Sequence, residues 1–261
     1  MNERYNCILK EPEMNTSTFH PPSSVSKAML FAAGLGTRLK PFTDNHPKAL
    51  AVVNGKTLLE RNIKYLKGFG INEFVINVHH FANQIFDFLE KNEKFGVNIQ
   101  ISDESDEVLE TGGGLVKAKE LLGNQPFLVM NVDILTDLNL SGLMNFHAQH
   151  QPLVTLAVSD RASSRKLLFE DNHQLKGWKN LNTGEEIIAS ENPLSEKAFS
   201  GIHIINPEIF DKMPTTGKFS IMTTYMELMK TEKILGFDHS GGTLVDVGRP
   251  ESILEAEKFF I

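Results

Sequence analysis

The chain has 261 residues, of which 41 % are hydrophobic and 23 % are charged, and its formal net charge at pH 7 is −7. This balance argues against a nucleic-acid-binding surface, which needs a broad basic face, while no run approaches the roughly 18 apolar residues of a membrane span. We therefore expect neither nucleic acid nor a membrane as partner. The single cysteine, Cys7, excludes a disulfide framework and a cysteine-based zinc site, so we expect a cytoplasmic protein.

The first part of the chain predicts a short extension followed by one α/β domain. Residues 1–26 are rich in Glu, Asn, Ser, Thr and Pro and show no helix or strand period, so we expect a flexible extension and a single domain over residues 27–261. Within the domain, strands are expected at 28–33, 74–78, 97–101 and 126–131, with helices at 58–67, 82–91 and 115–122. This alternation predicts an α/β fold with a Rossmann-like, mostly parallel (mixed) sheet that carries helices on both faces.

The second part is less regular but still rich in strands. We expect a hairpin from the segments 166–170 and 174–178, which flank the polar turn Asp171-Asn172. Further strands are expected at 153–158, 199–205, 234–237 and 243–247, the last two completing the sheet. A short helix is expected to start at Pro207, and longer helices are expected at 222–230 and 250–259. No hexapeptide repeat is present, so no β-helix extension is expected.

A glycine-rich loop follows the first predicted strand. Gly34 and Gly36 permit backbone conformations that a side chain would block, and they let amides approach phosphate oxygens. Arg38 offers a forked pair of donors and Lys48 a compact charge, so the loop predicts a triphosphate site, with a plain tight turn as the alternative. Leu39 stands where the dinucleotide fingerprint needs a third glycine, and the P-loop's Gly-Lys-Ser/Thr is missing, which argues against both motifs.

Two aspartates follow predicted strands and are candidate metal ligands. Asp133 ends the strand 126–131, and Asp246 ends a second apolar segment. The carboxyl ends of parallel strands are where open sheets bind ligands, and paired carboxylates suit Mg²⁺ together with phosphate oxygens and water. A helix cap or a turn is the alternative for either residue taken alone.

A second glycine cluster, Glu110-Thr-Gly-Gly-Gly, lies just before the predicted helix 115–122. Its glycines would let a planar base rest on bare backbone while exposed amides read the base's edge. The alternative is a helix N-cap by Thr111 with mobile glycines. Asn77 ends its own strand and either faces the nucleotide or bonds a loop.

For a sugar, the best candidates are Asn131 and Gly201. A glycine in the strand 199–205 would let a sugar ring approach the sheet, although Gly201 is equally consistent with a β-bulge.

The motifs resemble those of the sugar-1-phosphate nucleotidylyltransferases. The likeness rests on Ala32-Ala-Gly-Leu-Gly-Thr-Arg-Leu, Pro47-Lys48, Glu110-Thr-Gly-Gly-Gly, Asn131-Val-Asp133 and Asp246-Val-Gly, and it extends over about residues 28–260. It implies a nucleotidyltransferase (GT-A-like) architecture and Mg²⁺-dependent transfer of a nucleotidyl group from an NTP to a sugar 1-phosphate, with release of pyrophosphate. The Glu-Thr-Gly-Gly-Gly form is most like the N-acetylmuramate-1-phosphate uridylyltransferases, which favours UTP.

The resemblance and the residue chemistry together give a full candidate site. We expect Arg38, Lys48 and Asp133 to be catalytic and Asp133 and Asp246 to hold Mg²⁺, with Asn131 and Gly201 at the sugar. The expected nucleotide-binding residues are Ala33, Gly34, Gly36, Thr37, Arg38, Lys48, Asn77, Glu110, Thr111, Gly112 and Gly113.

Three other functions stay open at this point. Two keep the fold and change the substrates, to GTP with mannose 1-phosphate or to CTP with phosphocholine. The third is a regulatory subunit that binds nucleotide sugars with a degenerate site, which is disfavoured because all four charged residues of the expected site are present. The Glu-Lys-Pro motif of many hexose-1-phosphate enzymes is not recognisable between residues 166 and 191, so the sugar is not specified, and neither is an oligomeric state.

Overall fold

The computed structural model describes residues 25–261, so most of the expected extension lies outside the described residues. Its last two positions belong to the folded body. Val25 is buried, and the carbonyl of Ser26 accepts hydrogen bonds from the amides of Asn72 and Glu73.

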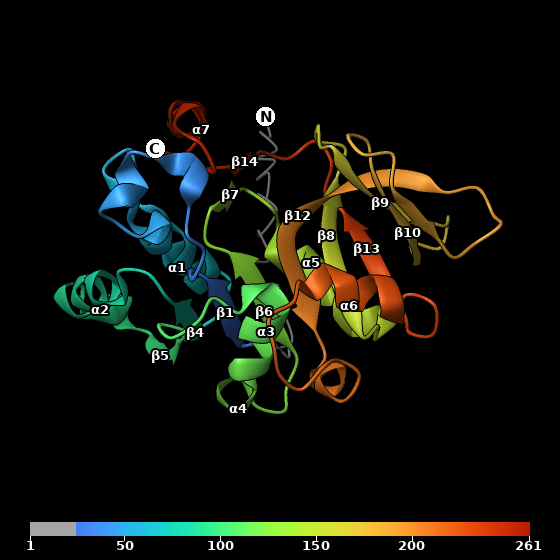
Figure 1. Cartoon of the computed structure of the whole chain (residues 1–261), viewed down its shortest axis with the longest axis horizontal. Helices are drawn as coiled ribbons and strands as arrows, with labels where there is room; N and C mark the ends of the chain where they lie inside the picture. Colours follow the sequence, from blue (N-terminus) through green and yellow to red (C-terminus); the bar gives the residue numbers. More distant parts are fainter. Residues whose placement is uncertain (1–24) are drawn as a thin grey trace, which may run out of the picture.

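Ten of the strands in the described residues form one mixed sheet (Figure 1). The strands, in chain order, are β1 (Lys27–Phe31), β2 (Val52–Val53), β3 (Lys56–Thr57), β4 (Glu73–Val78), β5 (Asn98–Asp103), β6 (Phe127–Asn131), β7 (Ile134–Thr136), β8 (Val154–Ser159), β9 (Arg165–Phe169), β10 (Leu175–Asn180), β11 (Glu186–Ile188), β12 (Ser195–Ile205), β13 (Ile234–Asp238) and β14 (Leu244–Asp246). The α-helices are α1 (Leu58–Gly68), α2 (Ala82–Lys91), α3 (Glu110–Lys117), α4 (Lys119–Leu122), α5 (Leu140–His150), α6 (Ile221–Leu228) and α7 (Pro250–Ala256). Short 3₁₀ helices lie at Thr37–Leu39, Phe42–Asp44, Lys48–Leu50, Glu93–Gly96 and Pro207–Asp211.

The sheet order explains why the fold is mixed. Its main path runs β11-β10-β9-β12-β6-β1-β4-β5, while β8 pairs with β12 and β13. The pairs β6–β1, β1–β4, β4–β5 and β8–β13 are parallel, whereas β12 runs antiparallel to β6, β8 and β9. The expected hairpin forms as β9 and β10, at the opposite end of the sheet from α2 (Figure 1). The parallel half therefore presents several strand carboxyl ends along one edge.

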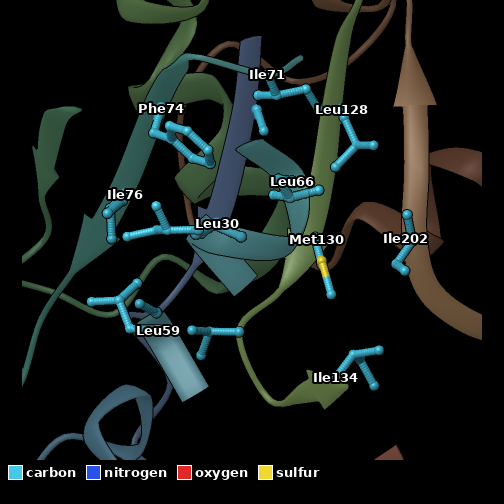
Figure 2. Close-up of a cluster of buried hydrophobic side chains, with 14 of the residues drawn as sticks. Leu30, Leu59, Leu66, Ile71, Phe74, Ile76, Leu128, Met130, Ile134 and Ile202 are labelled. Atoms are coloured by element: carbon cyan, nitrogen blue, oxygen red, sulfur yellow. The ribbon is translucent and has the colours of Figure 1, made fainter. Parts of the chain in front are cut away.

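Helices cover both faces of this sheet because its central strands are apolar on both sides. Leu30 packs in one cluster with residues of α1, α2 and α5, whereas its neighbour Met29 packs in another with residues of α3, α4 and α6. Successive strand residues point to opposite faces, so a strand buried on both sides reads as a continuous apolar run. Figure 2 shows the first cluster, with Leu59 and Leu66 of α1 beside strand residues such as Phe74. None of the described helices is long and apolar enough to cross a bilayer.

Two predicted boundaries are wrong. The helix expected at 115–122 begins at Glu110, takes the glycines into its first turns and breaks into α3 and α4 near Ala118. The segment 243–247 does not complete the main sheet, because β14 pairs with β7 in a separate two-stranded sheet. Helix α5 was not predicted, although its buried residues Leu140, Leu143, Met144 and His147 follow the helical spacing.

Candidate active site

A cavity of about 470 Å³ opens at the carboxyl ends of β1 and β6. Its lining combines six segments that are far apart in the chain. They are Phe31, Ala32, Ala33, Gly34, Leu35, Gly36, Thr37, Arg38 and Lys48; Asn77; Glu104, Val108, Glu110 and Thr111; Asn131, Val132 and Asp133; Lys218; and Gly248. The structure thus brings together eleven of the fifteen expected site residues, leaving Gly112, Gly113, Gly201 and Asp246 off the lining, with Asp246 adjacent to it.

The glycine-rich loop turns sharply at Gly36, not at Gly34. Gly36 has φ +61°, and a Cβ there would lie 2.8 Å from the Cγ2 of Thr43. Its carbonyl accepts hydrogen bonds from the amide of Leu39 (2.8 Å) and the hydroxyl of Thr43 (2.9 Å). Gly34 has no positive φ, and nothing lies within 4 Å of the Cβ it lacks, so the expectation of a special backbone conformation at both glycines holds for Gly36 alone. The space at Gly34 is open to the cavity.

Two cations and two carboxylates meet beside this loop. Lys48 forms an ion pair with Asp133, and its side chain is only 11 % exposed. Arg38 is exposed and forms no ion pair within the described residues, and its Nη2 lies 3.3 Å from the Cβ position that Gly248 lacks. The same position lies 2.8 Å from the Oδ1 of Asp246, so Gly248 leaves room for Arg38 and Asp246 to approach each other.

The pairing of β7 with β14 brings the two aspartates together. Asp246 lies opposite Ile134, the residue after Asp133, and the amide of Val247 donates 2.8 Å to the Asp133 carbonyl. Burial raises the pKa of Asp246, the Asp133 carboxylate raises it further, and Lys48, Arg38 and Arg161 act in the opposite direction. The Oδ1 of Asp246 is buried and accepts no hydrogen bond within the described residues.

These two carboxylates fit Mg²⁺. They are hard oxygen donors, one of them has an enclosed oxygen without a donor, and they lie beside a cavity that can supply phosphate oxygens. The described residues contain no group of three or more His, Cys, Asp and Glu side chains that could hold a metal. This donor set suits Mg²⁺, which binds through one or two carboxylates and keeps ligand positions for substrate and water.

Asn77 and Glu104 form a buried network behind the loop. The Oδ1 of Asn77 accepts hydrogen bonds from the amides of Ala32 (2.7 Å) and Ala33 (3.4 Å), and its Nδ2 donates to Glu104 (2.7 Å). Glu104 also accepts a bond from the amide of Leu109 (3.3 Å), and burial raises the pKa of its carboxyl group. Asn77 therefore holds the strand end that leads into the glycine-rich loop, which was the loop-bonding alternative for this residue.

The second glycine cluster packs against protein, not into the cavity. The amides of Gly112 (2.8 Å) and Gly113 (3.3 Å) both donate to the Phe219 carbonyl, so the expectation that these amides are exposed is wrong. A Cβ on Gly112 would lie 2.3 Å from the Phe219 ring, and one on Gly113 would lie 2.2 Å from the Gly217 carbonyl oxygen. The glycines are required because the loop before α6 lies directly on them.

Glu110 and Thr111 are the members of this cluster that reach the cavity. Thr111 does not cap its own helix; its Oγ1 accepts a bond from the amide of Ile221 (3.0 Å) and so caps α6. Glu110 has φ +60°, a left-handed conformation that is strained in a non-glycine residue and is frequent at functional sites.

Gly201 lies beside the cavity and marks a bulge. It has φ +74°, and the pairing of β12 with β8 is irregular between Phe199 and His203. A Cβ there would lie 3.0 Å from the Nδ2 of Asn131 and 2.9 Å from the Cγ1 of Ile134. The bulge alternative is therefore the observed one, and it seats β12 against Asn131 on the cavity floor.

Two charged lining residues were not predicted, Glu104 and Lys218. Glu104 directly follows β5, so the strand-end position that identified Asp133 could have found it. Lys218 lies in the exposed loop before α6, and nothing in its sequence surroundings indicates that this loop folds back over Gly112 and Gly113.

Comparisons with known proteins agree with this geometry. A family model described as nucleotidyl transferase matches residues 27–169. The chain belongs to this family. It is 36 % identical to the N-acetylmuramate alpha-1-phosphate uridylyltransferase of Neisseria meningitidis, over 88 % of this chain and 96 % of that protein. The enzyme of the same name from Caulobacter vibrioides is 31 % identical, over 88 % and 95 %. The predicted membership of the sugar-1-phosphate nucleotidylyltransferases is confirmed.

Solved structures of other proteins share the fold. HddC from Yersinia pseudotuberculosis, complexed with GMP-PN, superposes with a TM-score of 0.74 at 21 % identity, over 91 % of this chain and 100 % of that one. The inositol-1-phosphate CTP transferase from T. maritima gives a TM-score of 0.71 at 15 % identity, over 91 % and 98 %. The predicted nucleotidyltransferase architecture, a mixed sheet with helices on both faces, is confirmed.

Proposed function

We propose that this protein transfers the uridylyl group of UTP to N-acetylmuramate 1-phosphate and releases pyrophosphate, with Mg²⁺ bound by Asp133 and Asp246. The observation that carries the proposal is the meeting of Arg38 and Lys48 with these two carboxylates at one end of the cavity. The sugar and the base are taken from the two relatives that are more than 30 % identical over nearly their whole length. The substrate types and the single cysteine of the chain support a cytoplasmic location.

The reaction needs positioning and charge neutralisation more than proton transfer. An oxygen of the sugar phosphate attacks the α-phosphorus, and the bond from that phosphorus to the oxygen bridging to the β-phosphate breaks as pyrophosphate leaves. The nucleophile is already an anion, so no side chain has to remove a proton. The protein's task is to hold two anionic substrates in line and to balance the charge that develops on the leaving group.

The cationic residues of the cavity suit this task. Arg38, which forms no ion pair in the described part of the chain, offers its forked donors to phosphate oxygens, and Lys48 provides a charge next to the carboxylates. Lys218 adds a third cation to the cavity lining. It comes from the loop before α6, which lies against α3 near Glu110 and Thr111. These local charges let a chain of net charge −7 accept a triphosphate.

Asp133 and Asp246 would hold the metal. When bound, Mg²⁺ neutralises phosphate charge and polarises the α-phosphoryl group. The roles of the chain's own groups follow from their surroundings: Lys48 fixes the Asp133 carboxylate, and the Gly248 backbone leaves the space between Asp246 and Arg38 free of a side chain.

On the base side, Glu110 and Thr111 line the cavity, while Gly112 and Gly113 position them by packing under the loop before α6. We propose that base contacts come from Glu110, Thr111 and the backbone near Ala33, and that the two glycines act through packing. Gly201 likewise acts by seating β12 against Asn131, the residue we propose at the sugar.

The proposal is tested by supplying the purified full chain with Mg²⁺, each of the four NTPs and a panel of phosphate acceptors. Pyrophosphate release and product mass are measured together. UTP with N-acetylmuramate 1-phosphate is expected to give the highest kcat/KM. No pyrophosphate from any pair would contradict the proposal, whereas GTP with mannose 1-phosphate or CTP with phosphocholine as the best pair would replace it by one of the alternatives.

Substitution of Gly36 is expected to lower mainly the stability of the protein, whereas substitution of Gly34 is expected to weaken mainly the binding of UTP. Gly36→Ala should lower the free energy of unfolding by about 1–2 kcal/mol, because φ +61° is unfavourable for alanine and its Cβ meets Thr43. Gly34→Ala should change that free energy by less than about 0.5 kcal/mol, because nothing surrounds the new methyl group, yet it should raise the KM for UTP. Urea denaturation and initial rates check both variants. A Gly34→Ala protein with an unchanged KM would remove Gly34 from the nucleotide site.

A further inference from the structure

Arg161 is a half-buried cation that forms no ion pair with any carboxylate in residues 25–261. It follows β8, its Nη2 donates 2.8 Å to the Phe199 carbonyl, and its Nε is buried with no acceptor within the described residues. Asp160, the residue before Arg161, and Asp238 both pair with another cation, since Lys197 lies 2.7 Å from Asp160 and 2.5 Å from Asp238. The guanidinium is thus held in place by one hydrogen bond and has further N–H donors that an anion can accept from, in a chain of net charge −7.

The anchoring of Arg161 places it next to the proposed sugar position. Its partner Phe199 lies two residues before Gly201, in the bulge of β12. Gly201 is the residue that packs on Asn131, and Asn131 lines the cavity. Burial raises the pKa of Asp246 and the charge of Arg161 acts in the opposite direction, so Arg161 lies within electrostatic range of the proposed metal position.

His239 provides a second polar group on the same bulge. Its Nε2 lies 2.7 Å from the hydroxyl of Ser200, the residue between Phe199 and Gly201. Its Nδ1 is buried and has no partner within the described residues. Burial lowers the pKa of the ring and the Arg161 charge lowers it further, so the two side chains are neighbours. Among the residues that the structure describes, neither the Nε of Arg161 nor the Nδ1 of His239 has a partner, an arrangement that is costly for buried atoms unless a ligand or water completes it.

We propose that Arg161, supported by His239, binds the carboxylate of an acidic sugar and so selects a substrate that carries one. This inference rests on the proposed function. N-acetylmuramate differs from N-acetylglucosamine by a lactyl ether that ends in a carboxylate, a group that the forked donors of arginine match. With the 1-phosphate at Lys48 and the metal carboxylates, a sugar lying over Asn131 and Gly201 would reach the bulge of β12, to which Arg161 is anchored through the Phe199 carbonyl.

The phosphate of the substrate is a second anion that Arg161 could bind, and the two cases differ in a measurable ratio. The ratio is kcat/KM for N-acetylmuramate 1-phosphate divided by kcat/KM for N-acetylglucosamine 1-phosphate, both with UTP and Mg²⁺. A group that binds the lactyl carboxylate changes the ratio, whereas a group that binds the phosphate, or only supports the fold, changes both values equally.

Arg161→Gln should lower this ratio about 10- to 100-fold, the usual loss for one charge-assisted contact. Arg161→Lys keeps the charge but loses the forked pair of donors, so its ratio should lie between those of the wild type and Arg161→Gln. Arg165→Gln is the matched control, since Arg165 is exposed at the start of β9 and its side chain forms no hydrogen bond or ion pair within the described residues. Its ratio should equal that of the wild type.

Equal losses with both sugars in the Arg161 variants, or an unchanged ratio, would overturn the inference and leave the proposed function intact. Should Arg161→Gln fail to fold in a thermal melt, Arg161→Lys decides alone by the same ratio. A wild-type protein that turns over neither sugar phosphate with UTP would overturn the proposed function itself, and this inference with it.

Discussion

Replacement of Asp133 by asparagine is expected to lower kcat about 10³-fold and to leave the fold intact. The change removes one of the two carboxylates that suit Mg²⁺ and the partner of Lys48, and loss of a single electrostatic group of this kind costs about 10²–10³ in rate. The side chain is 20 % exposed at the end of β6, and the hydrogen bond between the Asp133 carbonyl and the Val247 amide involves backbone only. The free energy of unfolding should therefore change far less than the activity.

The control for this variant is Asp137→Asn. Asp137 lies on the same stretch of chain, and its Oδ1 accepts a bond from the Thr243 amide (2.7 Å) that an asparagine oxygen can also accept. Pyrophosphate release over a range of Mg²⁺ concentrations and a thermal melt are measured for both variants. Near wild-type kcat in Asp133→Asn, or equal losses in the two variants, would contradict the assignment of Asp133 as a metal ligand.

The elements that the sequence predicted well are those with long, strongly patterned segments. Strands such as β1 and β4 are buried on both faces and read as continuous apolar runs, and α1 carries a threonine cap whose hydroxyl accepts from the Glu60 amide (3.1 Å). Local chemistry decides these elements, so the order of strands and helices in the parallel half follows from the sequence.

The failures have a common cause, which is contact between segments far apart in the chain. Glycine disfavours helix, so the cluster 112–114 was expected to precede a helix; in the structure, packing under Phe219 outweighs that preference and the glycines lie within α3. The strands β7 and β14 have three residues each, too few to show a period, yet their pairing is what brings Asp246 next to Asp133. Strand ends could be predicted, but their partners could not.

The candidate site shows the same division. Its loop residues Gly36, Arg38 and Lys48 were found because they follow one strand in a recognisable order, whereas Lys218 reaches the cavity only through the fold of a distant loop. Arg161 was missed for a related reason. An arginine after a strand is ordinary in sequence, and only the structure shows that the neighbouring Asp160 pairs with Lys197.

Lys48→Met is expected to lower kcat/KM for UTP about 10²- to 10³-fold, comparable to the loss of one preorganised charge at a reacting centre. Methionine has nearly the same length and fills the space of a side chain that is 11 % exposed, but it cannot neutralise phosphate or hold the Asp133 carboxylate. The two aspartates then face each other without Lys48, which opposes the raised pKa of Asp246. Initial rates at varied UTP, with Mg²⁺ saturating, measure the effect.

Lys40→Met separates this role from the general positive charge of the loop. Lys40 lies close to Arg38 in sequence, but it is exposed and pairs only with Asp44 on the surface (2.8 Å), so its loss removes one charge from the same region without touching the carboxylates. Long-range attraction of UTP would be weakened in both variants and would disappear at high salt. A deficit in Lys48→Met that persists at high salt, with Lys40→Met near wild type, is the expected result, because a charge enclosed beside the reacting phosphates is poorly screened. Equal kinetics in the two variants would contradict a specific role of Lys48 at the reacting phosphates. Lys48 would then contribute only to the general positive charge of the loop, and Arg38 would be the main cation of the site.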